Sequence, residues 1–475
     1  MKQLLTTLLL ITLLLLQIPT TASAVSDPEI ISSKTAVVYC LESDTVLYDK
    51  GIDEKVYPAA IVKLMTAIVV YEKMESVGLT MDSLLTVSRR AYDAATGNNI
   101  SLQVGETMSL SDLMIAMMVA GANDAALVLS EAIGGSIEGF VELMNEKAKE
   151  IGMPNTYFGN PTGIHHTGMS TTPRDLIKMT SYAIRIPYLT ELCGTIRAVI
   201  PPTNRTEEER IVGTRNYLIS DRVSSRYYKS MATGMICGST QEAGYCAIAT
   251  GRHDGLTYIA VITGAGSHTV LTQQGGPQVD EEGNIVLDTM GEPVINPPVY
   301  ETILEGLLDA GTLLTWAHKS FSYKNIVDRF TAVIEVPVSL GQNTDSVTLM
   351  PLYPIERFVP NDIDMKKDVT FDYVLYDDDL EAPVKAGQEV GMLTVYYLGE
   401  EIGTVPLIVR NTIERSGGLT ILSGFLEILS TPFFLILGSL IALTAIFYVI
   451  STAINRQKKR TSARREYEKK TRYLK

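Results

Sequence analysis

The pattern of apolar and polar residues predicts strands at both ends of one long region and helices between them. Apolar and polar residues alternate around an acidic turn in residues 34–51, which predicts a β-hairpin. Helical periodicity dominates from Pro58 to about Ile186. Two apolar runs around Asp254-Gly255 predict a second hairpin in residues 243–265. This order indicates an α/β (α+β) sandwich, in which helices cover a sheet built from both ends of the region.

The residues after this region have a different pattern. Residues 267–298 are polar and contain Gly and Pro turns, and we interpret them as a surface insertion with a short hairpin at 284–296. Residues 299–321 have the pattern of a helix. The short alternating runs of residues 323–410 predict a separate small all-β domain, and residues 411–427 form a connector.

Both ends of the chain carry signals for a membrane. Residues 1–24 combine a basic residue, an apolar core and small residues, as a secretory signal does, although an uncleaved anchor has the same pattern. Residues 428–455 form an uncharged apolar segment that is long enough to cross a bilayer of about 30 Å. The alternative is that this segment forms a buried core helix. The tail 456–475 has ten Lys/Arg and two Glu, and such basic flanks stay in the cytoplasm. We expect a single-pass cell-membrane protein with most of its chain extracellular and a cytoplasmic C-terminal tail.

The charge of the exported part excludes one class of partner. The whole chain has a formal net charge of −14, and removing the +1 of residues 1–24 and the +8 of residues 456–475 leaves about −23. An acidic exterior argues against binding nucleic acid. The basic tail beside a membrane segment is more simply an orientation signal and an attraction to anionic lipid.

The cysteines indicate neither a metal site nor a redox motif. The chain has four cysteines, with no CxxC pair and no Cys/His cluster at zinc spacing, so we expect no metal and no cofactor. Cys237 and Cys246 could meet across adjacent strands, which the sequence does not decide. We favour buried, unpaired thiols.

One helix carries an unusual charge. The segment "YPAAIVKLMTAIVVYE" (57–72) places a single lysine, Lys63, among apolar residues, and only Ala60 stands one turn earlier. Charged side chains are rarely buried without a partner. With no hydroxyl beside it, a buried Lys63 should have a lowered pKa, unless Asn123 or water satisfies it.

Four segments resemble a known family. They are "YPAAIVKLMTA" (57–67), "MMVAGANDAA" (117–126), "GMICGSTQEAGYC" (234–246) and "GQEVGMLTVYYLGEEIGTVPLIV" (387–409). Together and in this order they are similar to D-alanyl-D-alanine carboxypeptidases, the low-molecular-weight penicillin-binding proteins that trim peptidoglycan stem peptides. The resemblance implies a serine β-lactamase/penicillin-binding-protein-like fold for residues 25–322, with peptidoglycan or a cell-wall protein as partner.

The resemblance also shows which reactive groups are missing. The family's S-x-x-K motif, a nucleophile with its base, is Ala60-Ile61-Val62-Lys63 here, so the serine is lost. Its S-x-N motif is Gly121-Ala122-Asn123, so the relay hydroxyl is lost and the amide stays. Lys63 and Asn123 are therefore vestigial catalytic residues in this interpretation.

The third motif and its surroundings have changed as well. K-T-G, which offers a cation and a hydroxyl to the substrate carboxylate, is Ile236-Cys237-Gly238. Gly238 and Ser239 remain as weak candidates for substrate binding, since the family's oxyanion hole uses the backbone amide after K-T-G. The N-x-H-G loop reads "NPTG" at 160–163 without its His, and the family's carboxylate-binding Arg has no counterpart, because no Arg occurs between 252 and 329.

No relocated motif replaces these losses. No lysine has a serine three residues before it, and His166-Thr167-Gly168 imitates H-T-G but lies far ahead of the strand, so we interpret it as a turn. Cys237 has no neighbouring His or Lys that would lower its pKa, and it occupies a substrate-lining position. Loss of the serine alone costs roughly 10⁶ in kcat in a serine protease.

The leading hypothesis is therefore a membrane-anchored pseudoenzyme of cell-wall metabolism, which serves as a scaffold or binding module. The alternative is an active serine-type carboxypeptidase that removes the terminal D-Ala, because fold does not establish function. A third possibility is a structural spacer that holds the basic tail near a cytoplasmic partner.

Overall fold

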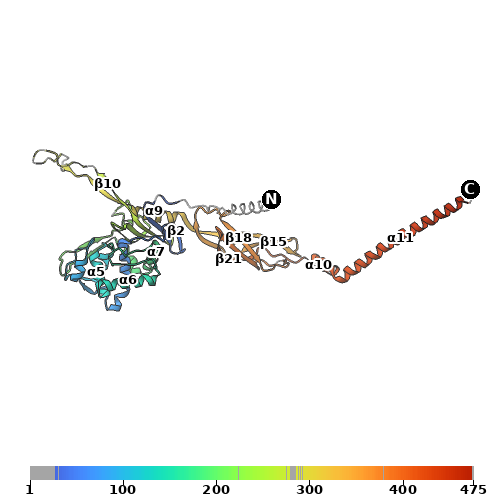
Figure 1. Cartoon of the computed structure of the whole chain (residues 1–475), viewed down its shortest axis with the longest axis horizontal. Coiled ribbons are helices and arrows are strands. Elements are labelled where there is room, and N and C mark those ends of the chain that lie inside the picture. The colour runs from blue at the N-terminus through green and yellow to red at the C-terminus, as the bar shows by residue number, and fades with distance from the viewer. Residues whose placement is uncertain are drawn as a thin grey trace, which may run out of the picture. The chain divides into compact units, whose positions relative to one another are not determined.

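The computed structural model describes residues 27–29, 31–222, 224–273, 275–278, 285–286, 288, 290, 292–377 and 379–472. The predicted signal in residues 1–24 and the last three residues of the basic tail lie outside these residues. The chain divides into two compact units, each described here by itself. One consists of Ala24–Ser322 with Phe358–Asp362, and the other of Tyr323–Arg357 with Ile363–Lys475. Their elements are labelled in Figure 1.

A five-stranded antiparallel sheet is the centre of the first unit. Its order is β2-β1-β9-β8-β7, with β1 at Thr35–Cys40, β2 at Thr45–Lys50, β7 at Ala232–Thr240, β8 at Gly244–His253 and β9 at Leu256–Ala265. Both predicted hairpins are confirmed, β1–β2 and β8–β9. Because β1 pairs with β9, the sheet does combine strands from both ends of the region, as the sequence predicts.

Alternation along the strands sends their side chains into two separate cores. Val37 of β1 and Ile259 of β9 belong to one buried cluster, with the helices that precede β7 in the chain. Ala36, Val38 and Ala260, their neighbours in sequence, belong to the other cluster, which the helix α9 (Glu305–Ser320) covers. The sheet therefore lies between two helical layers, and its period of two residues explains why both faces are apolar.

Several helices of the larger layer have side-chain N-terminal caps. The hydroxyls of Ser109, Ser136 and Thr172 accept backbone N–H groups at the starts of α4, α6 and α7. In chain order the helices are η1 (Ala59–Ile61), α2 (Val62–Lys73), η2 (Glu75–Val77), α3 (Arg89–Ala94), α4 (Leu110–Met118), α5 (Asn123–Gly134), α6 (Ile137–Ile151), α7 (Pro173–Ile184) and α8 (Pro187–Cys193). Short strands and one further turn complete this unit: β3 (Leu84–Thr86), β4 (Thr107–Ser109), β5 (Arg197–Ile200), β6 (Arg210–Gly213) and η3 (Tyr217–Ile219).

The segment after β9 corrects one expectation. Residues 299–321 were expected to be a helix, but Val299–Leu304 is a strand, β13, which pairs with β10 (Ser267–Gln273). The β-branched and aromatic residues of β13 favour this pairing, and the helix begins only at Glu305. In Figure 1 β10 projects from the rest of this unit as part of a narrow ribbon. A second short pair, β11 (Gly276–Pro277) with β12 (Ile295–Asn296), continues from it.

The second unit is the all-β structure expected from the sequence. Its six-stranded sheet has the order β18-β20-β21-β16-β15-β19. The bounds are β15 (Ile334–Ser339), β16 (Ser346–Pro351), β18 (Val369–Leu375), β19 (Leu380–Glu381), β20 (Glu389–Tyr397) and β21 (Glu400–Val409). A separate two-stranded sheet pairs β14 (Phe321–Val327) with β17 (Ile355–Pro360), and the division between the two units falls within both strands.

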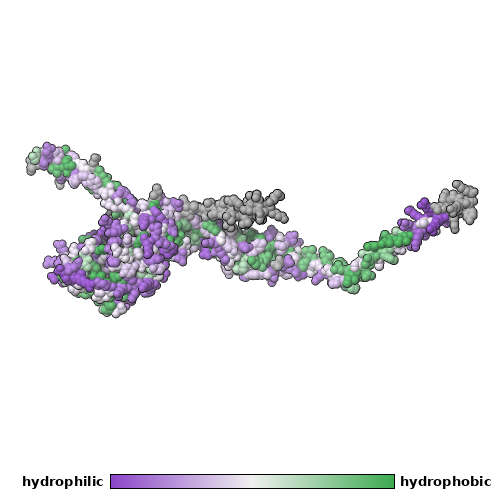
Figure 2. Space-filling model, viewed as in Figure 1, coloured by the Kyte–Doolittle hydropathy of each residue, from purple (hydrophilic) through white to green (hydrophobic). Residues whose placement is uncertain are grey.

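Two helices follow this sheet, where the sequence analysis assigned a connector and one apolar segment. α10 spans Gly417–Ser430, and α11 spans Pro432–Arg472. The break falls at Thr431-Pro432, since a proline is favoured in the first turn of a helix and cannot continue a preceding one. Among the described residues, only the helix over Pro432–Glu466 is long and apolar enough to cross a membrane. Figure 2 shows its apolar surface giving way to a hydrophilic one toward the C-terminus.

Candidate active-site cleft

A cleft of about 440 Å³ lies where the start of α2, the loop before α5 and β7 meet. It brings together nearly all residues singled out from the motifs: Ala60, Lys63, Gly121, Asn123, Cys237, Gly238 and Ser239. Ile236 lines a small adjoining cavity beside Ala60 and Lys63. The three degenerate motifs therefore converge at one site.

Strand β7 lies directly against the position where the family has its serine. A Cβ atom built on Gly238 would lie 2.5 Å from the Cβ of Ala60, so only glycine fits there. On the opposite side, a Cβ atom on Gly163 would lie 1.9 Å from the carbonyl oxygen of Ala59. Because both residues are glycines, the backbone on each side lies close to the turn that carries Ala60. The side chain of Ala60 is only a methyl group.

Lys63 is buried and has one partner. Its side chain is 2 % exposed, and Nζ donates a hydrogen bond of 2.7 Å to the backbone oxygen of Thr162. Burial, followed by the nearby charge of Arg215, lowers the pKa of Lys63 to about 7. The expected decrease of the pKa is confirmed, but the partner is a carbonyl and not Asn123.

Asn123 has an unused acceptor that lines the cleft. The side chain is 5 % exposed, and Nδ2 donates a hydrogen bond of 2.7 Å to the backbone oxygen of Thr96. Its Oδ1 is buried and has no hydrogen-bond partner among the described residues. A buried polar atom without a partner costs free energy, so this oxygen marks a locally unfavourable contact in the wall of the cleft.

An arginine occupies the neighbourhood of the lost relay serine. A Cβ atom on Gly121 would lie 3.2 Å from Cδ of Arg215 and 3.2 Å from Nδ2 of Asn98. Arg215 Nη1 in turn donates a hydrogen bond of 3.3 Å to Asn98 Oδ1. Sequence reasoning missed Arg215 because it stands between β6 and η3, in none of the three motifs. The cleft therefore has a cation, although Ile236 has replaced the lysine of K-T-G.

Cys237 is unsuited to nucleophilic attack. Burial raises its pKa to about 11, and its thiol donates a hydrogen bond of 3.2 Å to the backbone oxygen of Arg215. Cys237 and Cys246 lie on the adjacent strands β7 and β8, and both are free and buried, in agreement with the favoured interpretation. Ser239 is exposed, and no described basic side chain is hydrogen-bonded to its hydroxyl.

The loop between α6 and α7 places a histidine in the wall of the cleft. The sequence analysis noted that the loop had lost its histidine at Thr162, but His165 of the same loop lines the cleft. Its ring meets the ring of Tyr57 edge to face at a centroid distance of 4.8 Å. The spacing gave no signal for this histidine, because it stands outside the four-residue motif. Thr167 and Gly168 form a turn, as expected for the H-T-G imitation.

These groups can hold a ligand, but they cannot form an acyl-enzyme at position 60. A methyl group has no lone pair to attack a carbonyl, while the lysine beside it is half neutral near pH 7. The cleft thus combines the exposed cation of Arg215 and the buried amine of Lys63 with a methyl group at the position of the family's serine.

Comparisons with known proteins agree with the fold. A sequence model described as D-alanyl-D-alanine carboxypeptidase matches residues 21–267, and one described as the C-terminal domain of penicillin-binding protein 5 matches residues 321–415. The D-alanyl-D-alanine carboxypeptidase DacF of Bacillus subtilis is 27 % identical over 429 residues, which cover 89 % of this chain and 97 % of the relative.

More distant matches support the same fold. DacC of Escherichia coli, also a D-alanyl-D-alanine carboxypeptidase, is 24 % identical and is matched over 79 % of this chain and 82 % of its own length. The crystal structure of penicillin-binding protein 5 from Haemophilus influenzae shares the fold with a TM-score of 0.53 at 22 % identity, covering 82 % of this chain and 99 % of that one. Since the first sequence model covers more than half of its length, the chain belongs to the D-alanyl-D-alanine carboxypeptidase family.

Proposed function

We propose that this chain is a membrane-anchored, non-catalytic member of its family that acts in cell-wall metabolism by binding without cleavage. The observation that carries the proposal is the methyl group of Ala60 beside the buried amine of Lys63. In this family the residue at that position must attack a carbonyl, and no described side chain in the cleft is placed to do so instead. Family membership alone does not supply the activity.

The remaining groups of the cleft support noncovalent binding of a peptide. Arg215 is exposed and carries a charge that can pair with a carboxylate. The backbone amides of Ala60 and Ser239 can donate to a carbonyl oxygen of the same ligand. Peptidoglycan stem peptides carry both a carboxylate and carbonyl groups, so we favour peptidoglycan over a protein partner, although a cell-wall protein can offer the same chemistry.

The apolar part of α11 supports the membrane anchor. It is followed by a dense run of Lys and Arg from Arg456 onward, which in a spanning helix would remain in the cytoplasm. We therefore propose a single span, with both compact units outside the cell and a short basic tail inside. Proteolysis of the tail in inside-out vesicles, but not in intact cells, would support this topology.

Labelling with a fluorescent penicillin tests the proposed loss of activity. The chain should give no labelled band, whereas the variant Ala60→Ser/Ile236→Lys/Cys237→Thr should give one, because it restores nucleophile and cation. Gly121 is left unchanged in this control, because its φ of 74° strains other residues and a Cβ there would press on Arg215. A band from the unmodified chain that persists after Lys63→Ala but disappears after Cys237→Ala would contradict the proposal.

A further inference from the structure

A two-stranded arm extends from the first unit in the part of the chain between the two family matches. Its strands are β10 (Ser267–Gln273) and β13 (Val299–Leu304), whereas the matched regions end at residue 267 and begin again at residue 321. In Figure 1 the arm projects from the sheet and helices of this unit. A two-stranded ribbon is marginally stable in water, so a further strand paired with it would stabilise it.

Two hydrogen bonds at the base of the arm show which backbone groups of β13 point away from β10. The N–H of Glu305 donates to the oxygen of Gly266, across the ribbon. The N–H of Leu304 instead donates to the hydroxyl of Tyr227, which belongs to neither strand. Backbone groups of alternate residues point to the same side of an antiparallel strand. Those of Thr302 therefore point to the outer edge, as those of Leu304 do.

Strand β10 has an open outer edge as well. Thr269 lies directly opposite Thr302, and opposed residues of an antiparallel pair point their backbone groups both inward or both outward. Those of Thr269 therefore point outward, and so do those of Leu271. No other strand in the described part of the chain pairs with this edge. It contains neither the lysine nor the proline that usually protects an edge strand, and its one irregularity follows Leu271.

The edge of β13 is less suited to receive a further strand. Its outward N–H at Leu304 is already bonded to Tyr227, and the residues before the strand are Pro297 and Pro298, which have no N–H to donate. Of the two edges of the arm, that of β10 is therefore the better one for pairing.

Exposed apolar side chains lie beside this edge. Leu271 and Tyr300 are directly opposed in the ribbon, and they are 51 % and 61 % exposed. Opposed side chains lie on the same face of a sheet, so the two form one apolar patch. Figure 2 shows apolar residues among hydrophilic ones along the arm. A strand added to β10 would combine backbone hydrogen bonds with apolar contacts to this patch.

The charge of the arm indicates the chemistry of its partner. Residues 267–304 contain six Asp/Glu and no Lys/Arg. At the base, Glu301 is paired with Arg226 at 3.1 Å, whereas Asp288 and Glu292 are exposed further along the arm, where the sequence supplies no basic residue. A second copy of this chain would bring the same negative charge. Charge complementarity therefore favours a partner rich in Lys and Arg.

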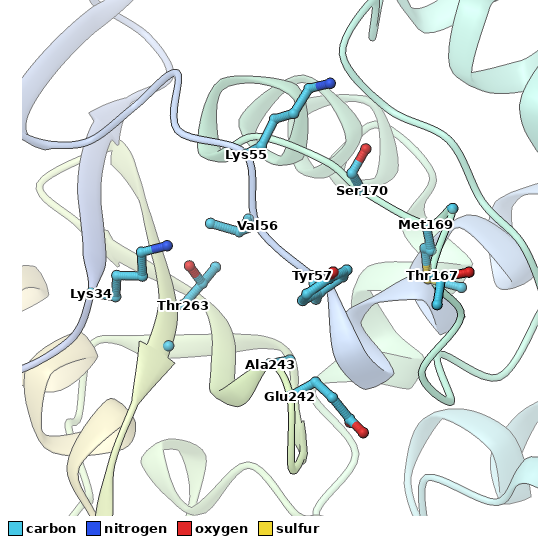
Figure 3. A pocket seen from close by; sticks show the side chains of 12 residues that line it. Lys34, Lys55, Val56, Tyr57, Thr167, Met169, Ser170, Glu242, Ala243 and Thr263 are labelled. Atoms are coloured by element: carbon cyan, nitrogen blue, oxygen red, sulfur yellow. The ribbon is translucent and has the colours of Figure 1, made fainter.

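The cavity beside the cleft gives no comparable indication of a ligand. It has a volume of about 470 Å³, and its lining includes Lys34, Lys55 and Glu242. Figure 3 shows the two lysines on different sides of the cavity, and Lys34 lies 3.9 Å from Glu54. Because the carboxylates offset the lysines, no single charge dominates there, in contrast to the arm.

We infer that the outer edge of β10 is a docking site for an extended, Lys/Arg-rich segment of another protein, which joins the ribbon as a third strand. This inference goes beyond the proposed function of the cleft, because the docking site requires neither the cleft nor peptidoglycan. It would give the chain a protein partner through a segment that the family matches do not include.

Binding of a strand-forming peptide to the full chain in detergent tests the inference. The probe is fluorescein-labelled Lys-Val-Thr-Val-Lys-Val-Thr-Val-Lys, and fluorescence anisotropy measures its dissociation constant. We expect a value below about 1 mM, and at least about tenfold weaker binding when glutamate replaces each lysine of the peptide. A peptide with proline in place of both threonines keeps the charge but loses two N–H donors, and it should also bind at least about tenfold more weakly.

Matched variants of the chain distinguish the two edges. Thr269→Pro removes an outward N–H of β10, and Thr302→Pro removes the opposed one of β13, so the hydrogen bonds within the ribbon are kept in both. Thr269→Pro should weaken binding of the basic peptide at least about tenfold, and Thr302→Pro should leave it within about twofold. Leu271→Thr keeps the charge and the strand propensity, and should weaken binding about two- to fivefold. Thermal midpoints show whether each variant retains the fold.

Several results would overturn the inference. They are the absence of binding by the basic peptide, equal binding of the acidic one, and undiminished binding by Thr269→Pro. Self-association of the unmodified chain in sedimentation equilibrium that Thr269→Pro abolishes would also overturn it, because a second copy would then occupy the edge. None of these probes contains a β-lactam or a D-Ala-D-Ala terminus, so this failure is distinct from failure of the proposed function.

Discussion

Replacing Lys63 by methionine should stabilise the protein near neutral pH and destabilise it in alkaline solution. The folded protein holds this amine in an apolar environment that lowers its pKa from 10.5 to about 7. Between these two values the unfolded chain binds a proton that the folded chain does not bind, so the stability of the unmodified protein rises with pH in this window. Below about pH 7 both states are protonated, and the full penalty of the buried charge is present.

The magnitude follows from the pKa difference and from one hydrogen bond. A decrease from 10.5 to about 7 corresponds to a penalty of about 5 kcal/mol in acid, which falls by about 1.4 kcal/mol for each pH unit above 7. Methionine removes this penalty but leaves the Thr162 oxygen without its donor, at a cost of about 1–3 kcal/mol. The variant should therefore be more stable by about 2–4 kcal/mol at pH 6, and the sign should reverse between about pH 8 and 10.

Urea unfolding of both proteins in detergent measures this difference. The chain has a single tryptophan, Trp316 in α9, so its fluorescence reports on the unit that contains Lys63. The contributions of other titrating groups to the free energy of unfolding cancel, because only the difference between the two proteins at each pH is used. A difference that stays constant from pH 6 to pH 9 would refute the reasoning, since it would mean that Lys63 keeps its charge throughout this range.

Three further predictions concern the same unit. Ala60→Ser alone should give at most weak penicillin labelling, because the K-T-G cation is still absent; strong labelling in a gel assay would argue against this. Glu106→Ala should destabilise the unit by about 3–5 kcal/mol in urea unfolding, because the buried carboxylate accepts a 2.7 Å hydrogen bond from Arg210, whose charge would lose its partner. Since burial raises the pKa values of Cys237 and Cys246 to about 11, both should resist iodoacetamide at pH 8 in the folded protein and react after unfolding, as counted by mass spectrometry.

The sequence was sufficient for the fold because its periodicities are strong. The alternating residues of β1 and β2, the apolar runs of β8 and β9 and the Asp254-Gly255 turn predict the hairpins, and in the structure φ is positive at both turn residues. The segment Val299–Leu304 was misassigned because six residues with apolar spacing fit a helix as well as a strand. Its β-branched and aromatic residues favour a strand, but it is the pairing with β10 that decides between the two, and the partner strand cannot be identified from this segment alone.

The composition of the cleft could be predicted only where a motif exists. Ala60, Lys63, Gly121 and Asn123 were found because the segments that carry them resemble the family's motif segments. Arg215 was missed because it stands in none of the motifs and lines the cleft only through the folding of the segment between β6 and η3. The carbonyl partner of Lys63 could not be predicted from the sequence either, since any residue can supply a backbone oxygen.

The most direct test of the central claim is the release of D-alanine from a peptide that ends in D-Ala-D-Ala. The purified full chain in detergent is incubated with this peptide, and free D-alanine is measured against buffer and against an active family member. The proposed loss of catalysis predicts release equal to that in buffer, even after long incubation. Release above the buffer level that is abolished by Lys63→Ala would contradict it, and would show that the cleft still catalyses hydrolysis without a serine at position 60.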